Sequence, residues 1–398
     1  MKSIREIYRI GYGPSSSHTM GPRKAAEIFY AKYPDAARYE VTLYGSLAAT
    51  GHGHMTDVAI MDTIPGIRIV WKPHTFLDFH PNGMEFRAYD ADGKETGKWL
   101  IYSVGGGALA APDYTEPNTP DLYDRHTLLD IMHYCEFEGK GYWEYVEDCE
   151  GKEIWDYLRT VWRIMVEAVE RGLDAEGVLP GPLHLRRKAN MYYVKASGYK
   201  DNIRTRGLVF AYALAVAEEN ASGGRIVTAP TCGSCGVMPG VLYHLWKSRN
   251  FSEKRILHAL ATAGLVGNIV KQNASISGAE VGCQGEVGVA CAMASAAATQ
   301  LFGGSVAQIE YAAEMGLEHH LGMTCDPVCG LVQIPCIERN AYAAARALDA
   351  NLYSSFTDGS HRVSFDKVVE VMKQTGHDLP SLYKETGEGG LARDFHQM

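Results

Sequence analysis

The sequence predicts an α+β protein, with a small α/β-mixed N-terminal domain followed by an all-helical domain. Residues 1–115 alternate short β-branched runs with helical patterns, whereas the chain after about residue 206 is rich in alanine and almost continuously helical in pattern. The length of 398 residues is enough for two hydrophobic cores. We therefore expect a small domain over 1–115, a linker with a short helix over 116–154, and a helical domain over 155–398.

The N-terminal elements follow from local patterns. Gly21-Pro22 places a proline in the first turn of a helix predicted over 23–32. The alternating, β-branched run 39–44 predicts a strand. Turn pairs at Asn82-Gly83 and Asp92-Gly93 separate further strands, which we expect over 67–71, 84–89 and 98–104.

The later elements are helical. Residues 152–171 place apolar side chains at helical spacing with charges opposite them, which predicts an amphipathic helix. We also expect helices over 128–136 and from about 241, and alanine-rich helices over 207–220, over 256–271 and around Cys291. The many small residues after 206 indicate that these helices pack closely together.

Composition limits the class of protein. Hydrophobic residues make up 46% and charged residues 21%, which is typical of a soluble globular protein. A net charge of −9 argues against nucleic acid or an anionic membrane as a partner. The first residues contain no secretory apolar run, and the run 287–299 is too short to span a bilayer. We therefore expect a cytoplasmic protein, whose nine cysteines serve as thiols or metal ligands rather than disulfides.

Two polar loops in the N-terminal domain are candidates for binding or catalysis. The loop 13–22, GPSSSHTMGP, offers short hydroxyl donors that suit a small anion, and His18 adds a titratable ring. The alternative is an ordinary helix cap. In the loop 50–60 we favour a functional role for His54 and a solvent-exposed position for His52. A third loop, SVGGG at 103–107, lets the backbone approach a ligand or simply makes a turn.

Three cysteines stand beside glycine or proline, at expected element ends: Cys283, Cys325 and Cys336. Forty-one and then ten residues intervene between them, which matches neither a bacterial ferredoxin run nor a zinc ribbon. Three thiolates from separate loops suit a 4Fe–4S cluster with one open iron, although three core cysteines are the alternative. Cys291 lies in an alanine-rich helical run and is expected in the core.

A second cysteine pattern, Cys232-x-x-Cys235, is typical of redox and zinc motifs. No second pair follows at zinc-finger spacing, and its surroundings are helical rather than βαβ. We therefore keep redox chemistry there only as a minor alternative.

Long motifs make the chain similar to a known family. They are GPSSSHTMGP, GHMTD, SVGGG, EGVLPGPL, ENASGGRIVTAPT, NASISGAEVGCQGEVGVAC and CDPV-x-GLVQIPCIERNA. With these motifs the chain resembles the iron–sulfur-dependent L-serine dehydratases of bacteria over nearly its whole length. The resemblance implies that Cys283, Cys325 and Cys336 bind a 4Fe–4S cluster and that L-serine is converted to pyruvate and ammonia. It also implies a small α+β domain, an all-helical cluster-binding domain and a homodimer.

The resemblance suggests roles for further residues. His18 and His54 are candidates for the base that removes the α-proton or for substrate positioning, and Lys271 is the second choice of base if burial lowers its pKa. The substrate carboxylate would be held by Ser15, Ser16, Ser17 and Thr19. Three residues near the cysteines would complete the pocket, namely Asn273, Ser275 and Ser277.

Two departures from the family pattern leave questions open. Many relatives have a cysteine near the C-terminus as a resting ligand, whereas this sequence has none after Cys336, so water or another group such as His396 is expected there. Cys232 stands where relatives usually have asparagine, and Cys329 is an extra thiol. We hypothesise that one of them approaches the cluster or alters substrate preference.

Other functions stay open at this point. The same chemistry could act on L-threonine or L-cysteine, since both carry a β leaving group. A different class is a non-catalytic iron–sulfur sensor that binds an amino acid. Pyridoxal-phosphate chemistry is not favoured, because no lysine stands in a Schiff-base motif.

Overall fold

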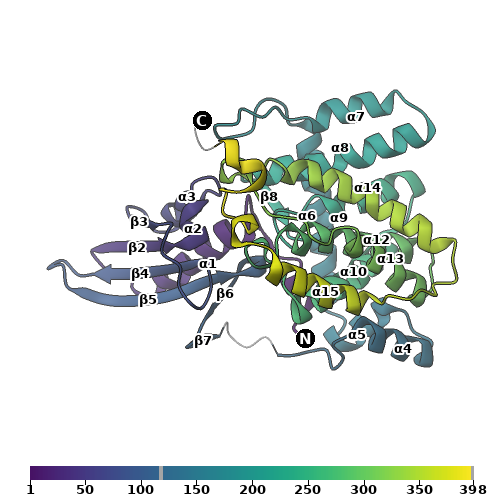
Figure 1. The fold of residues 1–398 in the computed structure, drawn as a ribbon, viewed down its shortest axis with the longest axis horizontal. Coiled ribbons are helices and arrows are strands. Elements are labelled where there is room, and N and C mark those ends of the chain that lie inside the picture. The colour runs from purple at the N-terminus through teal and green to yellow at the C-terminus, as the bar shows by residue number, and fades with distance from the viewer. Residues whose placement is uncertain (116–119, 396–398) are drawn as a thin grey trace.

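The computed structural model describes residues 1–115 and 120–395. A six-stranded sheet lies beside a larger helical region, and Figure 1 shows the yellow C-terminal segment running along the boundary between them. This arrangement confirms the predicted α+β fold with a helical C-terminal part. Within the described ranges, no helix is both long and apolar enough to cross a membrane.

The sheet has the strand order β3-β2-β4-β5-β6-β7, in which β2 and β3 are parallel and the other neighbours are antiparallel. The strands are β2 (Arg38–Tyr44), β3 (Arg68–Lys72), β4 (Gly83–Tyr89), β5 (Glu95–Val104), β6 (Ala108–Ala111) and β7 (Tyr114–Thr115). All four strands predicted in this domain form. Strands β6 and β7 were not predicted, because β6 is alanine-rich and β7 is only two residues long.

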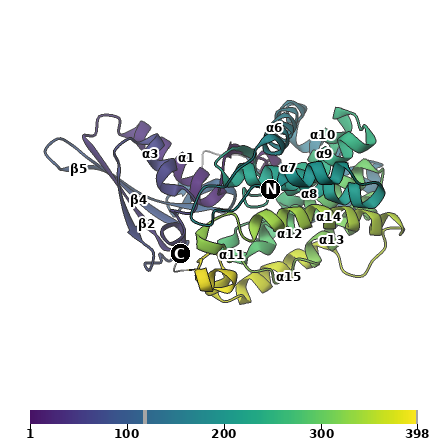
Figure 2. The same ribbon diagram turned by 90° about the horizontal axis from the view of Figure 1, so that it is seen from above.

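Helices cover one face of this sheet, as Figure 2 shows for α1 (Gly21–Lys32) and α3 (Thr56–Thr63). Buried Ala25, Ala26 and Phe29 of α1 pack in one apolar cluster with sheet residues such as Val41 and Phe86. The short helix α2 (Gly45–Ala49) follows β2 directly. Both polar loops of the N-terminal domain lie at the ends of these helices.

The helical region contains α4 (Leu128–Glu138), α5 (Tyr142–Glu150), α6 (Ile154–Asp174), α7 (Ala189–Ser197), α8 (Asp201–Ala221), α9 (Val237–Arg249), α10 (Glu253–Asn273), α11 (Gly278–Val281), α12 (Val287–Leu301), α13 (Val306–Glu318), α14 (Cys336–Ser355) and α15 (Phe365–Asp378). Helix α12 is its buried centre. A Cβ at Gly316 of α13 would stand 2.8 Å from the Cα of Ala292 in α12. The expectation of close packing through small residues is therefore confirmed.

The first residues of the chain belong to the helical core. Met1, Ile4, Ile7 and Tyr8 are buried there, and the Tyr8 hydroxyl donates to the carbonyl of Leu260 at 2.8 Å. Strand β1 (Ile10–Tyr12) then pairs antiparallel with β8 (Arg225–Val227). The chain is thus anchored in the helical region before it builds the sheet.

The sequence assigns 116–154 to a linker with a short helix, and the described part of that segment contains α4 and α5. Both helices contribute buried side chains to the large apolar core, including Leu128, Ile131, Tyr142 and Tyr145. Residues 116–119 lie outside the described ranges.

Candidate functional site

The three cysteines lie at the starts of elements in the helical region. Cys283 begins the 3₁₀ turn η4 (Cys283–Gly285) before α12, and Cys336 is the first residue of α14. Cys325 pairs through its backbone with the C-terminal segment, in an isolated bridge to Lys384. The Cys325 thiol interacts electrostatically with both other thiols, so the three sulfurs share one site. Burial raises the pKa of each thiol, that of Cys283 to about 11.

Arg339 supplies positive charge beside these thiols. It lies one turn after Cys336 on α14, donates to the carbonyl of Thr324 at 2.7 Å and stands 3.6 Å from an oxygen of Asp326. Its guanidinium lowers the pKa of Cys283 and Cys336 against the effect of burial. We did not single out Arg339 from the sequence, although its i, i+3 spacing from Cys336 at a helix start was a usable signal.

Glu286 brings a carboxyl group to the same site. Its Oε1 accepts a hydrogen bond from the Thr231 hydroxyl at 2.9 Å, and burial raises its pKa. A Cβ at Gly278 would stand 2.8 Å from Glu286 Oε2 and 3.1 Å from Cys325 Sγ. Glycine at this position therefore keeps space open between the carboxyl and the thiol.

His54 is buried, and within residues 1–115 and 120–395 only Nδ1 of its two ring nitrogens makes a hydrogen bond. The Thr50 hydroxyl donates to the carbonyl of Ser46 at 3.1 Å, so it accepts from His54 Nδ1 at 3.0 Å. The neutral ring then leaves Nε2 unprotonated. Burial, with a further contribution from His18, holds the pKa of His54 well below its ordinary value, so the ring is neutral near pH 7.

His18, by contrast, uses both ring nitrogens. The Ser46 hydroxyl donates to the carbonyl of Glu385 at 3.0 Å and therefore accepts from His18 Nε2 at 3.2 Å. Ser17 Oγ lies 2.9 Å from His18 Nδ1. Burial lowers the pKa of His18 to about 4. The two histidine rings contact each other edge to face, with centroids 4.5 Å apart.

Glu385 of the C-terminal segment joins the two histidines. Its Oε1 lies 3.7 Å from His18 Nδ1, and ligand atoms of His18, His54 and Glu385 all lie within 4.8 Å of one another. The backbone N–H of Glu385 donates to the carbonyl of Cys325 at 2.8 Å. Its carboxyl is buried, which raises its pKa well above the ordinary value. Glu385 thus links the histidine loops to the cysteines, a connection that sequence separation concealed.

The hydroxyls of the serine-rich loop bind within the loop and to its neighbour. Ser15 Oγ accepts from the His18 backbone N–H, while Thr19 Oγ1 accepts from the Ser15 N–H and donates to the carbonyl of His54. Ser16 is buried as well. The loop is the π-helical turn η2 (Ser16–Met20), and these bonds fix His18 against His54. Carboxylate binding by the loop stays a prediction.

The remaining predicted residues are distributed over a wider area. Lys271 forms an ion pair with Glu6, and Asn273 donates to the carbonyl of His126 at 2.7 Å. Ser275 and Ser277 lie in the loop before Gly278, beside the cysteine site. The contacts of Lys271 and Asn273 thus direct them toward the N-terminal segment and the residues before α4.

The thiols of Cys232 and Cys329 contact different parts of the protein. Cys232 Sγ stands 3.4 Å from the sulfur of Met20, and Cys232 and Cys235 are both free thiols. Cys329 Sγ stands 3.6 Å from the carbonyl of Phe395. His396, a conceivable ligand, lies outside the described residues. A role of Cys232 or Cys329 toward a cluster stays a hypothesis.

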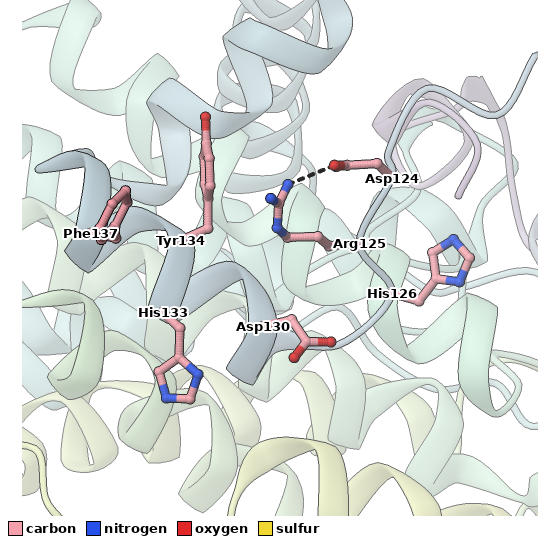
Figure 3. Close-up of a pocket in the computed structure, with 7 residues that line it drawn as sticks. All are labelled: Asp124, Arg125, His126, Asp130, His133, Tyr134 and Phe137. Carbon is pink, nitrogen blue, oxygen red and sulfur yellow. Dashed lines mark hydrogen bonds and ion pairs between the residues drawn. The ribbon is translucent and has the colours of Figure 1, made fainter.

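A cavity of about 570 Å³ opens elsewhere, at the start of α4 (Figure 3). Its lining is Asp124, Arg125, His126, Asp130, His133, Tyr134 and Phe137. Arg125 is paired with Asp124 at 2.7 Å, and the rings of His126 and His133 point away from each other. None of the residues predicted for the site lines this cavity.

Comparison with known proteins gives matches along the chain. Residues 3–68 match the family model of the serine dehydratase beta chain, and residues 70–392 match that of the serine dehydratase alpha chain. An L-serine dehydratase of Streptomyces coelicolor is 40% identical, with 98% of both chains covered. L-serine dehydratase 1 of Escherichia coli is also 40% identical, over 98% of this chain and 99% of its own. An L-serine dehydratase of Helicobacter pylori is 35% identical over 98% of both.

Proposed function

The chain belongs to the iron–sulfur L-serine dehydratase family, with the beta and alpha regions fused in one chain, and we propose that it converts L-serine to pyruvate and ammonia. The observation that carries this proposal is the meeting of two sets of residues from distant parts of the sequence. Three thiols from the helical region share one site, and Glu385 connects that site to the neutral pair His18 and His54.

Cys283, Cys325 and Cys336 would hold a 4Fe–4S cluster. The donor set fits, because three thiols share one site with Cys283 and Cys325 buried, Arg339 offsets thiolate charge, and glycine at 278 keeps Cys325 Sγ clear. When bound, a cluster with three protein ligands supplies an open iron that acts as a Lewis acid toward the leaving β-hydroxyl.

The protein's own part in the reaction is removal of the α-proton. His54 is the better base of the two histidines, because its Nε2 is unprotonated in the tautomer that Thr50 selects. His18 has partners at both ring nitrogens and packs edge to face on His54. We assign His18 the task of positioning His54. The aminoacrylate product then tautomerises and hydrolyses without further help.

The activity is tested by purifying the protein without air and measuring pyruvate from L-serine. We expect pyruvate and ammonia in equal amounts, and loss of activity on exposure to air together with loss of iron. An iron-free enzyme that works equally well in air would overturn the cluster proposal.

The same assay separates the remaining alternatives. Comparing kcat/KM for L-serine, L-threonine and L-cysteine identifies the preferred substrate, and we expect L-serine. A protein that contains a cluster and binds L-serine without forming pyruvate would instead be a sensor.

We also propose a homodimer. The support is a group of exposed apolar side chains on α7, the turn after it and the start of α8, which includes Met191, Val194, Tyr199 and Ile203. Light scattering on the purified protein decides between one and two chains.

A further inference from the structure

Next to the histidine loops lies a turn, His80-Pro81-Asn82, that precedes β4. The backbone N–H of Ser46 donates to the carbonyl of Pro81 at 3.2 Å, and Ser46 itself contacts His18. His80 also lies close enough to His18 to lower its pKa slightly further, beyond the larger effect of burial. The turn therefore forms one side of the region around His18.

Three buried polar atoms in this area have no hydrogen-bond partner among the described residues: His80 Nε2, Asn82 Oδ1 and Ser277 Oγ. The residues that carry them are 6%, 0% and 3% exposed. Leaving such an atom unpaired destabilises the folded protein, so native proteins rarely keep several together without a reason. A polar ligand that pairs with Asn82 Oδ1 and Ser277 Oγ supplies that reason, whereas His80 Nε2 faces Glu280 Oε1 at 3.5 Å.

Their chemistry can be assigned atom by atom. Asn82 Nδ2 already donates to the carbonyl of Ser103 at 3.2 Å, so its free Oδ1 is an acceptor. His80 Nδ1 accepts from the Asn82 backbone N–H at 3.1 Å, which places the proton of the neutral ring on Nε2. This Nε2 lies 3.5 Å from Glu280 Oε1.

Glu280 ties this turn to the helical region. Its other oxygen accepts from the Ser275 hydroxyl, and Ser275 Oγ accepts from the backbone N–H of Ser277 at 3.1 Å. The Glu280 side chain is 43% exposed, so a solute can reach its carboxylate. Two positions before Glu280, Gly278 stands against Cys325 Sγ. The acceptors Asn82 Oδ1 and Glu280 thus lie between the histidine loops and the cysteine site.

We propose that Asn82, Ser277 and Glu280 bind the α-ammonium group of the amino-acid substrate, while His80 holds Glu280 in position. An ammonium group donates three hydrogen bonds and carries a positive charge, which matches an amide oxygen, a hydroxyl oxygen and a carboxylate. This inference rests on the proposed function, because it names the part of an amino-acid substrate that these residues recognise.

The test compares L-alanine, which carries the ammonium group but no β-hydroxyl, with propionate, which lacks both. Binding of each to the cluster-containing protein is measured by anaerobic calorimetry. Replacing Glu280 by Gln or Asn82 by Leu is expected to weaken L-alanine binding about tenfold or more, the usual size for a hydrogen bond to a charged group. Propionate binding is expected to stay unchanged.

Asn82→Asp retains the acceptor and should restore L-alanine binding that Asn82→Leu loses. Glu136→Gln changes an exposed carboxyl on α4 and should behave like the unaltered protein. Equal losses for L-alanine and propionate would show general damage to the site and overturn the inference, as would variants that bind L-alanine normally. Pyruvate formation by the unaltered protein is measured separately and tests the proposed function. If no pyruvate forms, the calorimetric comparison of L-alanine with propionate can still be interpreted.

Discussion

At the scale of single residues, hydroxyl partners distinguish two otherwise similar buried histidines. Thr50 fixes the proton of His54 on Nδ1, and Ser46 fixes that of His18 on Nε2. Each hydroxyl donates its own proton to a backbone carbonyl, so it accepts from the histidine nitrogen that it contacts. His54 Nε2 is therefore unprotonated, whereas both ring nitrogens of His18 have partners. The assignment of base and positioning residue depends on this difference.

Replacing His54 by Gln should lower kcat for L-serine at least about 100-fold, because proton removal by a positioned base contributes 10²- to 10⁴-fold. Iron content should stay unchanged, since His54 is not among the proposed ligands. The assay is anaerobic pyruvate formation with iron analysis of the same sample. His52→Gln, at an exposed side chain in the same loop, is the control and should retain activity. Full activity of His54→Gln would remove His54 as the base.

The lowered pKa of His18 makes the stability of the protein depend on pH. Its pKa is about 4 in the folded protein and about 6.5 when unfolded, so below pH 6.5 the unfolded chain takes up the proton first. The contribution of the neutral His18 ring to the free energy of unfolding is fully present above pH 6.5. Up to about 3 kcal/mol of this free energy is lost as pH falls from 6.5 to 4. Urea unfolding at pH 7, 5.5 and 4.5 should show a shallower decline in His18→Gln. If stability fell as steeply with pH in His18→Gln as in the unaltered protein, the lowered pKa of His18 would be contradicted.

Several site residues could be predicted from the sequence and others could not. Cys283, Cys325 and Cys336 were marked by neighbouring glycine and proline, and the structure brings their thiols together. Glu286 and Glu385 were not singled out, because a glutamate outside any metal-ligand or catalytic spacing looks like a surface residue even where, as at Glu286, a glycine precedes it. Their burial results from long-range packing, which a local pattern does not contain.

At the scale of elements, the C-terminal segment 381–395 covers the cysteine site. Its backbone pairs with Cys325 on both sides, through Tyr383 and Glu385. Asp326 holds the next part, because its Oδ2 accepts from the Leu391 N–H at 2.6 Å. Gly390 permits this approach, since a Cβ there would stand 2.1 Å from the same oxygen.

Replacing Asp326 by Ala should loosen this segment. Loss of the bond to Leu391 is expected to speed amide hydrogen exchange in 381–395 by roughly tenfold, the effect of about 1 kcal/mol or more of lost local stability. Exchange is measured by mass spectrometry. Glu388→Ala, at an exposed position in the same segment, should leave exchange unchanged. Unchanged exchange in Asp326→Ala would mean that the segment is held by other contacts.

Elements with strong periodicity were predicted well, and short ones were not. The amphipathic run 152–171 forms α6 (Ile154–Asp174). Strands β1 and β8 have three residues each and exist only because they pair across more than 200 residues of sequence. No window of the sequence contains both partners, so local reasoning gave almost pure helix after residue 206.

At the scale of the whole molecule, the first eight residues connect the two regions. Tyr8 is fully buried in the helical core and donates to the carbonyl of Leu260, while the strand that follows leads to the serine-rich loop. Gly13, just before that loop, packs against Asn220, where a Cβ would stand 2.2 Å from the backbone oxygen. The position of His18 therefore depends on helices α8 and α10.

Tyr8→Ala should lower the free energy of unfolding by about 3–5 kcal/mol, as for other large aromatic truncations in cores. Tyr8→Phe keeps the ring and should cost only about 1 kcal/mol for the lost hydrogen bond. Urea unfolding followed by circular dichroism measures both. A Tyr8→Ala protein as stable as the unaltered one would show that the N-terminal segment is not an anchor.

The central claim is that three cysteines hold an iron–sulfur cluster on which serine dehydration depends. The most direct test is iron and sulfide analysis of anaerobically reconstituted Cys325→Ser, with pyruvate formation measured on the same sample. Cys291→Ser is the matched control, because Cys291 is a buried thiol within α12. We predict that the unaltered protein and Cys291→Ser contain about four irons per chain and form pyruvate, as a 4Fe–4S site requires, whereas Cys325→Ser loses both. Normal iron content and activity in Cys325→Ser would contradict the account.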